Sequence, residues 1–156
     1  MYRIFKSRGQ YFIQRWDYDV KDCFHSALLE CGTLSRKKIL FFSELTADIG
    51  LKDIQWILEN NPSLLKEWTI FETFSCFELK NGSHINFSKN KYSVLWCDCV
   101  FINNLTELKN ENLHHILSIL REDNEQFKAL IPTYLLEDFY EYFERIVDRA
   151  VGRLLE

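Results

Sequence analysis

The alternation of apolar and polar residues predicts a hairpin at the start of the chain. Tyr2–Lys6 and Gln10–Trp16 have the pattern of two strands, and Ser7-Arg8-Gly9 between them is typical of a turn. A helix is expected next, capped by Asp17 or Asp19 and stopped by Gly32. Its apolar positions recur at helical spacing: Val20, Cys23, Phe24, Ala27, Leu28 and Cys31. Lys38–Phe42 then predicts a short strand.

The middle of the chain predicts two helices followed by sheet. Leu51–Asn60 has one apolar side, and Asn61-Pro62-Ser63 is a helix-start signal that predicts a second, short helix from Pro62 to about Trp68. Three strands are expected after it, over Thr69–Lys80, Ser83–Ser88 and Tyr92–Ile102. The turns between them are Asn81-Gly82 and Lys89-Asn90-Lys91, which indicates an antiparallel three-stranded meander.

The end of the chain has the periodicity of helices. One apolar face is formed by Leu113, Ile116, Leu117 and Leu120, and Glu125–Ile131 is also expected to be helical. Pro132-Thr133 breaks the pattern, and Tyr134–Leu155 predicts a long final helix with a wide apolar arc. The predicted fold class is therefore α+β: an antiparallel sheet, made of the N-terminal hairpin and the central meander, packed by helices including a long C-terminal helix. We expect one globular domain over residues 1–156.

The charge and composition of the chain limit the classes of partner that it is expected to bind. Residues 1–42 carry eight Lys/Arg against four Asp/Glu, whereas residues 43–156 carry eleven against nineteen. The net charge of −4 makes nucleic acid an unlikely partner, because that role needs cations to neutralise phosphates. No apolar run is long enough to cross a membrane, and the start lacks a signal-peptide pattern. We therefore expect a cytoplasmic protein that does not contact a membrane, with its five cysteines reduced.

The segment LWCDCVFINN, residues 95–104, is the stretch of the chain that most suggests a metal or redox site, because two cysteines flank an aspartate. Strand alternation predicts Cys97 and Cys99 on one face beside Leu95 and Phe101, and a core role outweighs a metal or redox role. No second cysteine pair or ligand-like histidine spacing accompanies them. Glycine-rich phosphate loops and the motifs of common hydrolases are also absent from the sequence, so no catalytic, cofactor or metal site is predicted.

Two surfaces are candidates for binding a protein partner. On the predicted final helix, the acidic residues spaced three or four apart form one stripe with a tyrosine at its edge: Glu137, Tyr140, Glu141, Glu144 and Asp148. The alternative is a solvated helix face. On the strand over Tyr92–Ile102, Trp96 and Asp98 share the face opposite the cysteines. Asp98 is predicted either to lie at an open interface or to pair with an internal Lys or Arg.

These features favour a protein-binding inhibitor. In size, acidity, ring content and lack of motifs, the chain resembles bacterial immunity proteins in overall character, although no motif is matched and no family residue is carried over. The resemblance implies that an acidic, aromatic surface neutralises a basic, nuclease-type toxin by covering its active surface. Two alternatives remain: a small enzyme whose site is assembled from scattered residues, and a regulatory or adaptor subunit of a complex.

Overall fold

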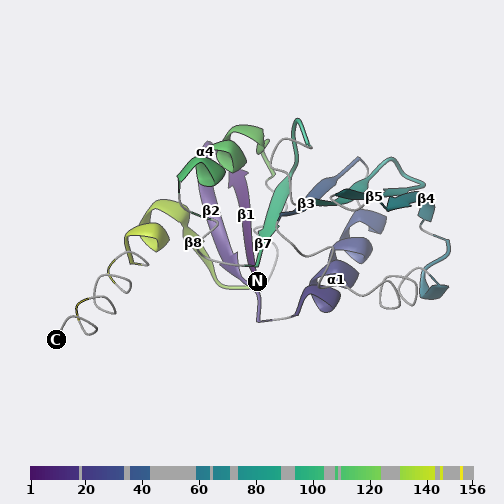
Figure 1. Cartoon of the computed structure of the whole chain (residues 1–156), viewed down its shortest axis with the longest axis horizontal. Coiled ribbons are helices and arrows are strands. Elements are labelled where there is room, and N and C mark those ends of the chain that lie inside the picture. Colours follow the sequence, from purple (N-terminus) through teal and green to yellow (C-terminus); the bar gives the residue numbers. More distant parts are fainter. Residues whose placement is uncertain are drawn as a thin grey trace.

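The computed structural model describes residues 1–17, 19–33, 36–42, 59–63, 65–70, 74–88, 94–103, 108, 110–123, 131–142, 145 and 152. One mixed eight-stranded sheet carries helices on both faces, and Figure 1 shows α1 and α4 on opposite sides of it. The elements in chain order are β1 (Tyr2–Ser7), β2 (Gln10–Arg15), α1 (Val20–Thr33), β3 (Lys38–Phe42), β4 (Leu65–Ile70), β5 (Phe74–Leu79), β6 (His84–Ser88), β7 (Cys99–Ile102), α4 (Asn110–Ile119) and β8 (Thr133–Leu135). The strand order is β4-β5-β6-β3-β7-β1-β2-β8.

The predicted N-terminal hairpin is confirmed. β1 and β2 pair antiparallel from Tyr2↔Arg15 to Ser7↔Gln10. The two residues between them, Arg8 and Gly9, both have positive φ, at 52° and 75°. This is the backbone of the two-residue turns whose twist matches that of paired strands.

The centre of the sheet is parallel, so the predicted antiparallel sheet is wrong. β3 lies between β6 and β7 and runs parallel to both, with Ile39 opposite Ile85 on one side and Cys99 on the other. The β5–β6 hairpin around Asn81-Gly82 is confirmed, but the meander is not, because β3 separates β6 from β7. Local patterns signal hairpins well, whereas a parallel pair joins segments that are far apart in the chain.

The short helix predicted from Pro62 to Trp68 is also wrong. Leu65–Ile70 is strand β4, which pairs with β5 through Trp68↔Phe77 and Thr69↔Cys76. Thr and aromatic residues favour a sheet once a partner strand is available, and that pairing overrides the helix-start signal. Glu59 and Asn60 are helical as predicted, whereas residues 51–58 of the first predicted helix lie outside the described part of the chain.

The described residues contain no long C-terminal helix, which corrects the prediction for Tyr134–Leu155. Tyr134 and Leu135 belong to β8, where they pair with Ile13 and Phe12 of β2. Residues 136–142, 145 and 152 are helical as predicted, and the other residues of the predicted helix beyond 142 lie outside the described part of the chain. The apolar residues that predicted one helix therefore belong to a strand at their start and to a helix after it. The strand forms because β2 offers an edge to which Thr133–Leu135 can hydrogen-bond. The helix predicted over Glu125–Ile131 lies almost wholly outside the described residues.

Two cores cover the two faces of the sheet. The first lies under α1 and is rich in phenylalanine, including Phe24, Phe41, Phe87 and Phe101. The second lies under α4 and is mainly aliphatic, including Ile4, Leu40 and Val100. Among the described residues, no helix is both long and apolar enough to cross a membrane.

Candidate functional site

A groove lies where β2, β8 and the helical residues 136–142 meet. Its volume is about 740 Å³, and its lining residues are Arg15, Asp17, Pro132, Tyr134, Leu135, Asp138, Phe139 and Tyr142. We call it the C-terminal groove. β8 positions its strand-side residues by pairing with β2, so the groove stands beside an edge of the sheet. Concave surfaces lined by rings with a few charged groups are typical of binding sites.

The aromatic rings that line the C-terminal groove are held by contacts with each other and with β1. Phe139 contacts Tyr2 of β1 at 5.8 Å and Tyr134 at 6.4 Å between ring centroids. Tyr142 is 62% exposed, and Tyr134 is exposed as well. Large exposed rings on a fixed base offer contact area at a low entropic cost, as in protein interfaces.

Among the described residues in and beside the C-terminal groove, carboxylates outnumber cations. Asp138 and Asp17 line it, and Arg15 forms an exposed ion pair with Asp17 at 3.3 Å between Nε and Oδ1. Glu137 and Glu141 are exposed on the same helical run. The groove therefore presents rings to a partner within a negatively charged rim, which favours a cationic one.

The structure brings together only part of the predicted acidic stripe. Glu137 and Glu141 are exposed and Tyr140 is partly buried, whereas Glu144 and Asp148 lie outside the described residues. The groove itself is lined by Asp138 and Tyr142 from the neighbouring helical positions, together with strand residues that periodicity had assigned to a helix. Arg15, Asp17 and Tyr142 were missed, because only the pairing of β8 with β2 brings them side by side.

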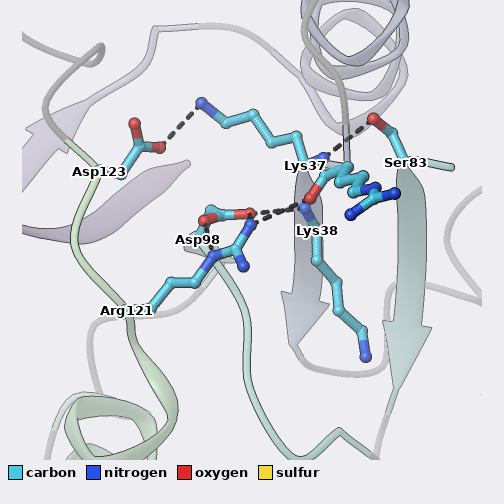
Figure 2. Close-up of polar contacts among 7 residues, drawn as sticks. Lys37, Lys38, Ser83, Asp98, Arg121 and Asp123 are labelled. Carbon is cyan, nitrogen blue, oxygen red and sulfur yellow. Dashed lines mark hydrogen bonds and ion pairs between the residues drawn. The ribbon is translucent and has the colours of Figure 1, made fainter. Parts of the chain in front are cut away.

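Asp98 is buried and bound within the chain. Its Oδ2 accepts a hydrogen bond from the Lys38 backbone N–H at 2.7 Å and one from Arg121 Nη2 at 3.1 Å, and its Oδ1 accepts from Arg121 Nε. The Asp98 N–H in turn donates to the Lys38 carbonyl at 2.7 Å. Figure 2 shows the carboxylate between Arg121 and the start of β3, which is the internal-cation alternative of the sequence prediction.

A second acid is paired nearby. Lys37 Nζ lies 2.8 Å from Asp123 Oδ2, and both side chains are almost fully buried. The Lys37 N–H donates to Ser83 Oγ at 3.0 Å, and the Asp123 N–H donates to the Lys6 carbonyl at 2.7 Å. Figure 2 shows the Lys37 and Lys38 side chains leaving the start of β3 in different directions. These contacts tie the segment after α4 to the amino end of β3.

Trp96 lies at the surface of this cluster. The Arg121 guanidinium carbon is 4.0 Å from the centroid of the Trp96 ring, and Lys38 Nζ is 5.0 Å from it. Trp96 is 39% exposed, and its neighbour Leu95 is 88% exposed. The ring therefore holds two cations by cation–π attraction while part of it stays open to solvent.

The two cysteines beside Asp98 are core residues on opposite faces of the sheet. Cys99 packs in the core under α1, and Cys97 packs in the core under α4. The prediction that they share a face with Leu95 is wrong, because β7 begins only at Cys99 and strand alternation does not extend back to Leu95. Burial raises the pKa of the Cys97 thiol well above its usual value, so the thiol stays protonated. Among the described residues, no three His, Cys, Asp or Glu side chains form a metal site.

Arg3 is a buried cation that the sequence pattern did not reveal. It lies on β1 and is 1% exposed, with its guanidinium carbon 5.3 Å from the ring centroids of both Trp16 and Phe101. An Arg among alternating strand residues reads as a solvent-facing position. Only the tertiary structure shows that α1 covers this face of β1.

No family model, no curated protein and no solved structure matches the chain.

Proposed function

We propose that this chain is a protein-binding inhibitor that uses the C-terminal groove to cover a basic surface of its partner. The observation that carries the proposal is the groove itself, about 740 Å³ in volume, with exposed tyrosines and the carboxylates of Asp17 and Asp138 in one lining. Rings supply the buried contact area of an interface, and acids at its rim steer a cationic partner.

The specific form that we propose is an immunity protein whose partner is a basic, nuclease-type toxin. The net charge of −4 supports it, as does the mechanism of occlusion, which needs a surface but no catalytic groups. The exposed Glu137 and Glu141 extend the negative charge along the helical run beside the groove. Such charges raise the association rate more than they raise the affinity.

The test starts from capture of a partner by the immobilised chain, followed by binding measurements with the purified partner. Tyr142→Ala should weaken binding by about tenfold or more, since exposed rings at an interface centre are frequent hot spots. Asp138→Lys should slow association and reduce its salt dependence. Addition of the wild-type chain should abolish the activity of the partner.

Matched controls are available on α1. Leu29 is a large apolar residue whose exposed fraction is 49%, and Asp22 is an exposed acidic residue. Neither residue lines the C-terminal groove. Leu29→Ala and Asp22→Lys should leave binding unchanged. A partner that binds Tyr142→Ala and Asp138→Lys as tightly as the wild type would refute the groove as the binding surface. A partner that stays active in the complex would refute inhibition.

A further inference from the structure

A second exposed surface surrounds Leu95 and Trp96, which directly precede two residues with hydrogen-bonded backbones. The Cys97 N–H donates to the Ile119 carbonyl at 2.9 Å, and the Arg121 N–H donates to the Cys97 carbonyl at 3.0 Å. The Asp98 N–H is bound to β3 as described above. Leu95 and Trp96, at 88% and 39% exposed, directly precede these bonded residues. Together they form an exposed apolar patch, and an apolar patch rimmed by charged groups is a sign of an interaction site.

Arg121 is held in place beside these residues. Two of its nitrogens, Nε and Nη2, donate to Asp98, and Nη2 also donates to the Arg36 carbonyl at 3.0 Å. Its guanidinium stacks on Trp96, yet the side chain remains 47% exposed. Among the described residues, Nη1 has no hydrogen-bond partner. A guanidinium held in one geometry can bind an external carboxylate with little loss of side-chain entropy.

The charge around Trp96 is opposite to that of the C-terminal groove. Lys38 and Arg121 both contact the Trp96 ring, and Arg36 is exposed next to them. Asp98, which is the acid in this cluster that faces Arg121, is buried and its oxygens are bound within the chain. Glu122, the exposed acid next to Arg121 in the sequence, accepts a hydrogen bond from the Gly9 N–H at 2.9 Å. Among the described residues that contact Trp96, the exposed charge is therefore positive.

We infer that Leu95, Trp96 and Arg121 form a second docking site, whose occupant is a protein segment that presents a carboxylate next to an apolar side chain. The carboxylate binds Nη1 of Arg121, and the apolar side chain packs on Leu95 and the open part of Trp96. A protein segment fits better than a nucleic acid, because Leu95 adds apolar surface and the net charge of −4 repels polyanions.

The site is independent of the C-terminal groove. β7 enters the sheet with Cys99 opposite Phe5, towards the end of β1, whereas Arg15 of the groove pairs with Tyr2 at its start. The two surfaces thus lie towards opposite ends of the same strand and carry opposite charges. One partner with both kinds of surface, or two partners, can be bound, and variants at one surface leave the other intact.

The experiment follows the Trp96 indole N–H in a ¹⁵N–¹H spectrum, assigned through Trp96→Phe. The probes are a short synthetic peptide in which Glu alternates with Leu, its counterpart in which Lys replaces Glu, and oligothymidylate. The Glu–Leu peptide should shift the Trp96 signal, and the two other probes should not. Leu95→Glu should weaken that binding by about tenfold, because it removes the apolar contact and also repels the peptide carboxylates. Leu95→Lys loses the same apolar contact but attracts the carboxylates, so it should weaken binding much less.

Leu29→Glu is the matched control and should leave the peptide affinity unchanged, since Leu29 is an exposed residue of α1, whereas the site is formed by the segments before β7 and after α4. The inference is overturned if the Lys–Leu peptide or oligothymidylate shifts Trp96 as strongly as the Glu–Leu peptide does. It is equally overturned if none of the probes shifts the signal, or if Leu95→Glu weakens binding no more than Leu95→Lys does. These outcomes do not depend on the C-terminal groove, so the proposed inhibitor function is tested separately.

Discussion

Asp98 shows how a single polar side chain can join two parts of the fold. Its carboxylate binds the backbone N–H of Lys38 at the start of β3 and the guanidinium of Arg121 after α4. A buried carboxylate is costly to desolvate and is tolerated only when its oxygens are bound. The same contacts orient Arg121 beside Trp96, so a residue inside the protein shapes a site on its surface.

Removal of the Asp98 carboxylate should therefore destabilise the protein. Asp98→Ala leaves the Lys38 N–H and the Arg121 Nε without their acceptor, and the free energy of unfolding should fall by about 2–4 kcal/mol in urea denaturation. Asp17→Ala removes a solvent-exposed ion pair and should cost less than about 0.5 kcal/mol. An equal, small effect of the two substitutions would show that the Asp98 contacts contribute nothing to stability.

The cysteine thiols lead to a pH-dependent prediction. Burial raises the pKa of Cys23 from an ordinary value of 9.0 to about 11. In the folded chain the thiol keeps its proton to a higher pH than in the unfolded chain, so this stabilising contribution is complete below about pH 9 and is lost as pH rises through 11. Cys23→Ser or Cys23→Ala should flatten the loss of stability measured between these pH values.

The same buried thiol should react slowly with iodoacetamide at pH 8, because only the thiolate is nucleophilic. Cys76, which is partly exposed, should be modified before Cys23 and Cys97, as read by mass spectrometry of peptides. Faster modification of Cys23 than of Cys76 in the folded protein would contradict the burial that raises the Cys23 pKa.

At the scale of the elements, β3 is the strand on which the sheet depends. It bonds to a parallel strand on each side, and four of its five residues are buried because helices cover both faces of the sheet. The ring centroid of its Phe41 lies 4.7 Å from those of both Phe87 and Phe101 in stacked arrangements. Continuous apolar sequence of this kind is typical of strands buried on both faces.

Truncation of the central ring should test this role. Phe41→Ala opens a cavity between two stacked rings and should lower the free energy of unfolding by about 3–5 kcal/mol. Leu29→Ala, at an exposed position of α1, should change it by less than about 0.5 kcal/mol. Urea unfolding of both variants beside the wild type provides the measurement. A loss below about 1 kcal/mol for Phe41→Ala would show that the stack is not a main source of stability.

At the scale of the whole molecule, the mixed sheet separates two surfaces of opposite charge. The C-terminal groove gathers carboxylates and tyrosines, whereas the surface around Trp96 gathers cations. Both sit beside strands that are anchored by their neighbours, which holds the exposed rings in place. Salt screens the attraction between exposed charges that are more than a Debye length apart, so a bound partner is affected mainly by the charges near it. A protein of net charge −4 can therefore have a locally positive binding site.

The sheet topology also predicts a gradient of stability. Amides of β3, β7 and β1 lie inside the sheet and should exchange with solvent deuterium most slowly, whereas those of the edge strands β8 and β4 should exchange first. Hydrogen exchange followed by NMR measures this order directly. If the amides of β8 were protected as strongly as those of β3, the sheet edge next to the C-terminal groove would be as stable as the centre of the sheet.

The sequence by itself determined what depends on neighbours along the chain. The N-terminal hairpin, α1, β3, the β5–β6 hairpin and α4 followed from turn residues and apolar periodicity, because those signals act within a few residues. The sequence also indicated that Asp98 must be solvated or paired, because an unpaired buried carboxylate is costly to desolvate. It indicated that Cys97 and Cys99 pack in a core, because a free cysteine behaves as a small apolar residue.

Only the tertiary structure decided which distant segments meet. The parallel pairs of β3, the strand character of Leu65–Ile70 and the pairing of β8 with β2 all depend on hydrogen bonds between segments remote in sequence. The groove and the Arg121–Trp96 contact follow from those pairings, and no spacing along the chain encodes them. Backbone groups bond to whichever strand edge the fold supplies, so a local preference for helix at Tyr134 yields when β2 offers that edge.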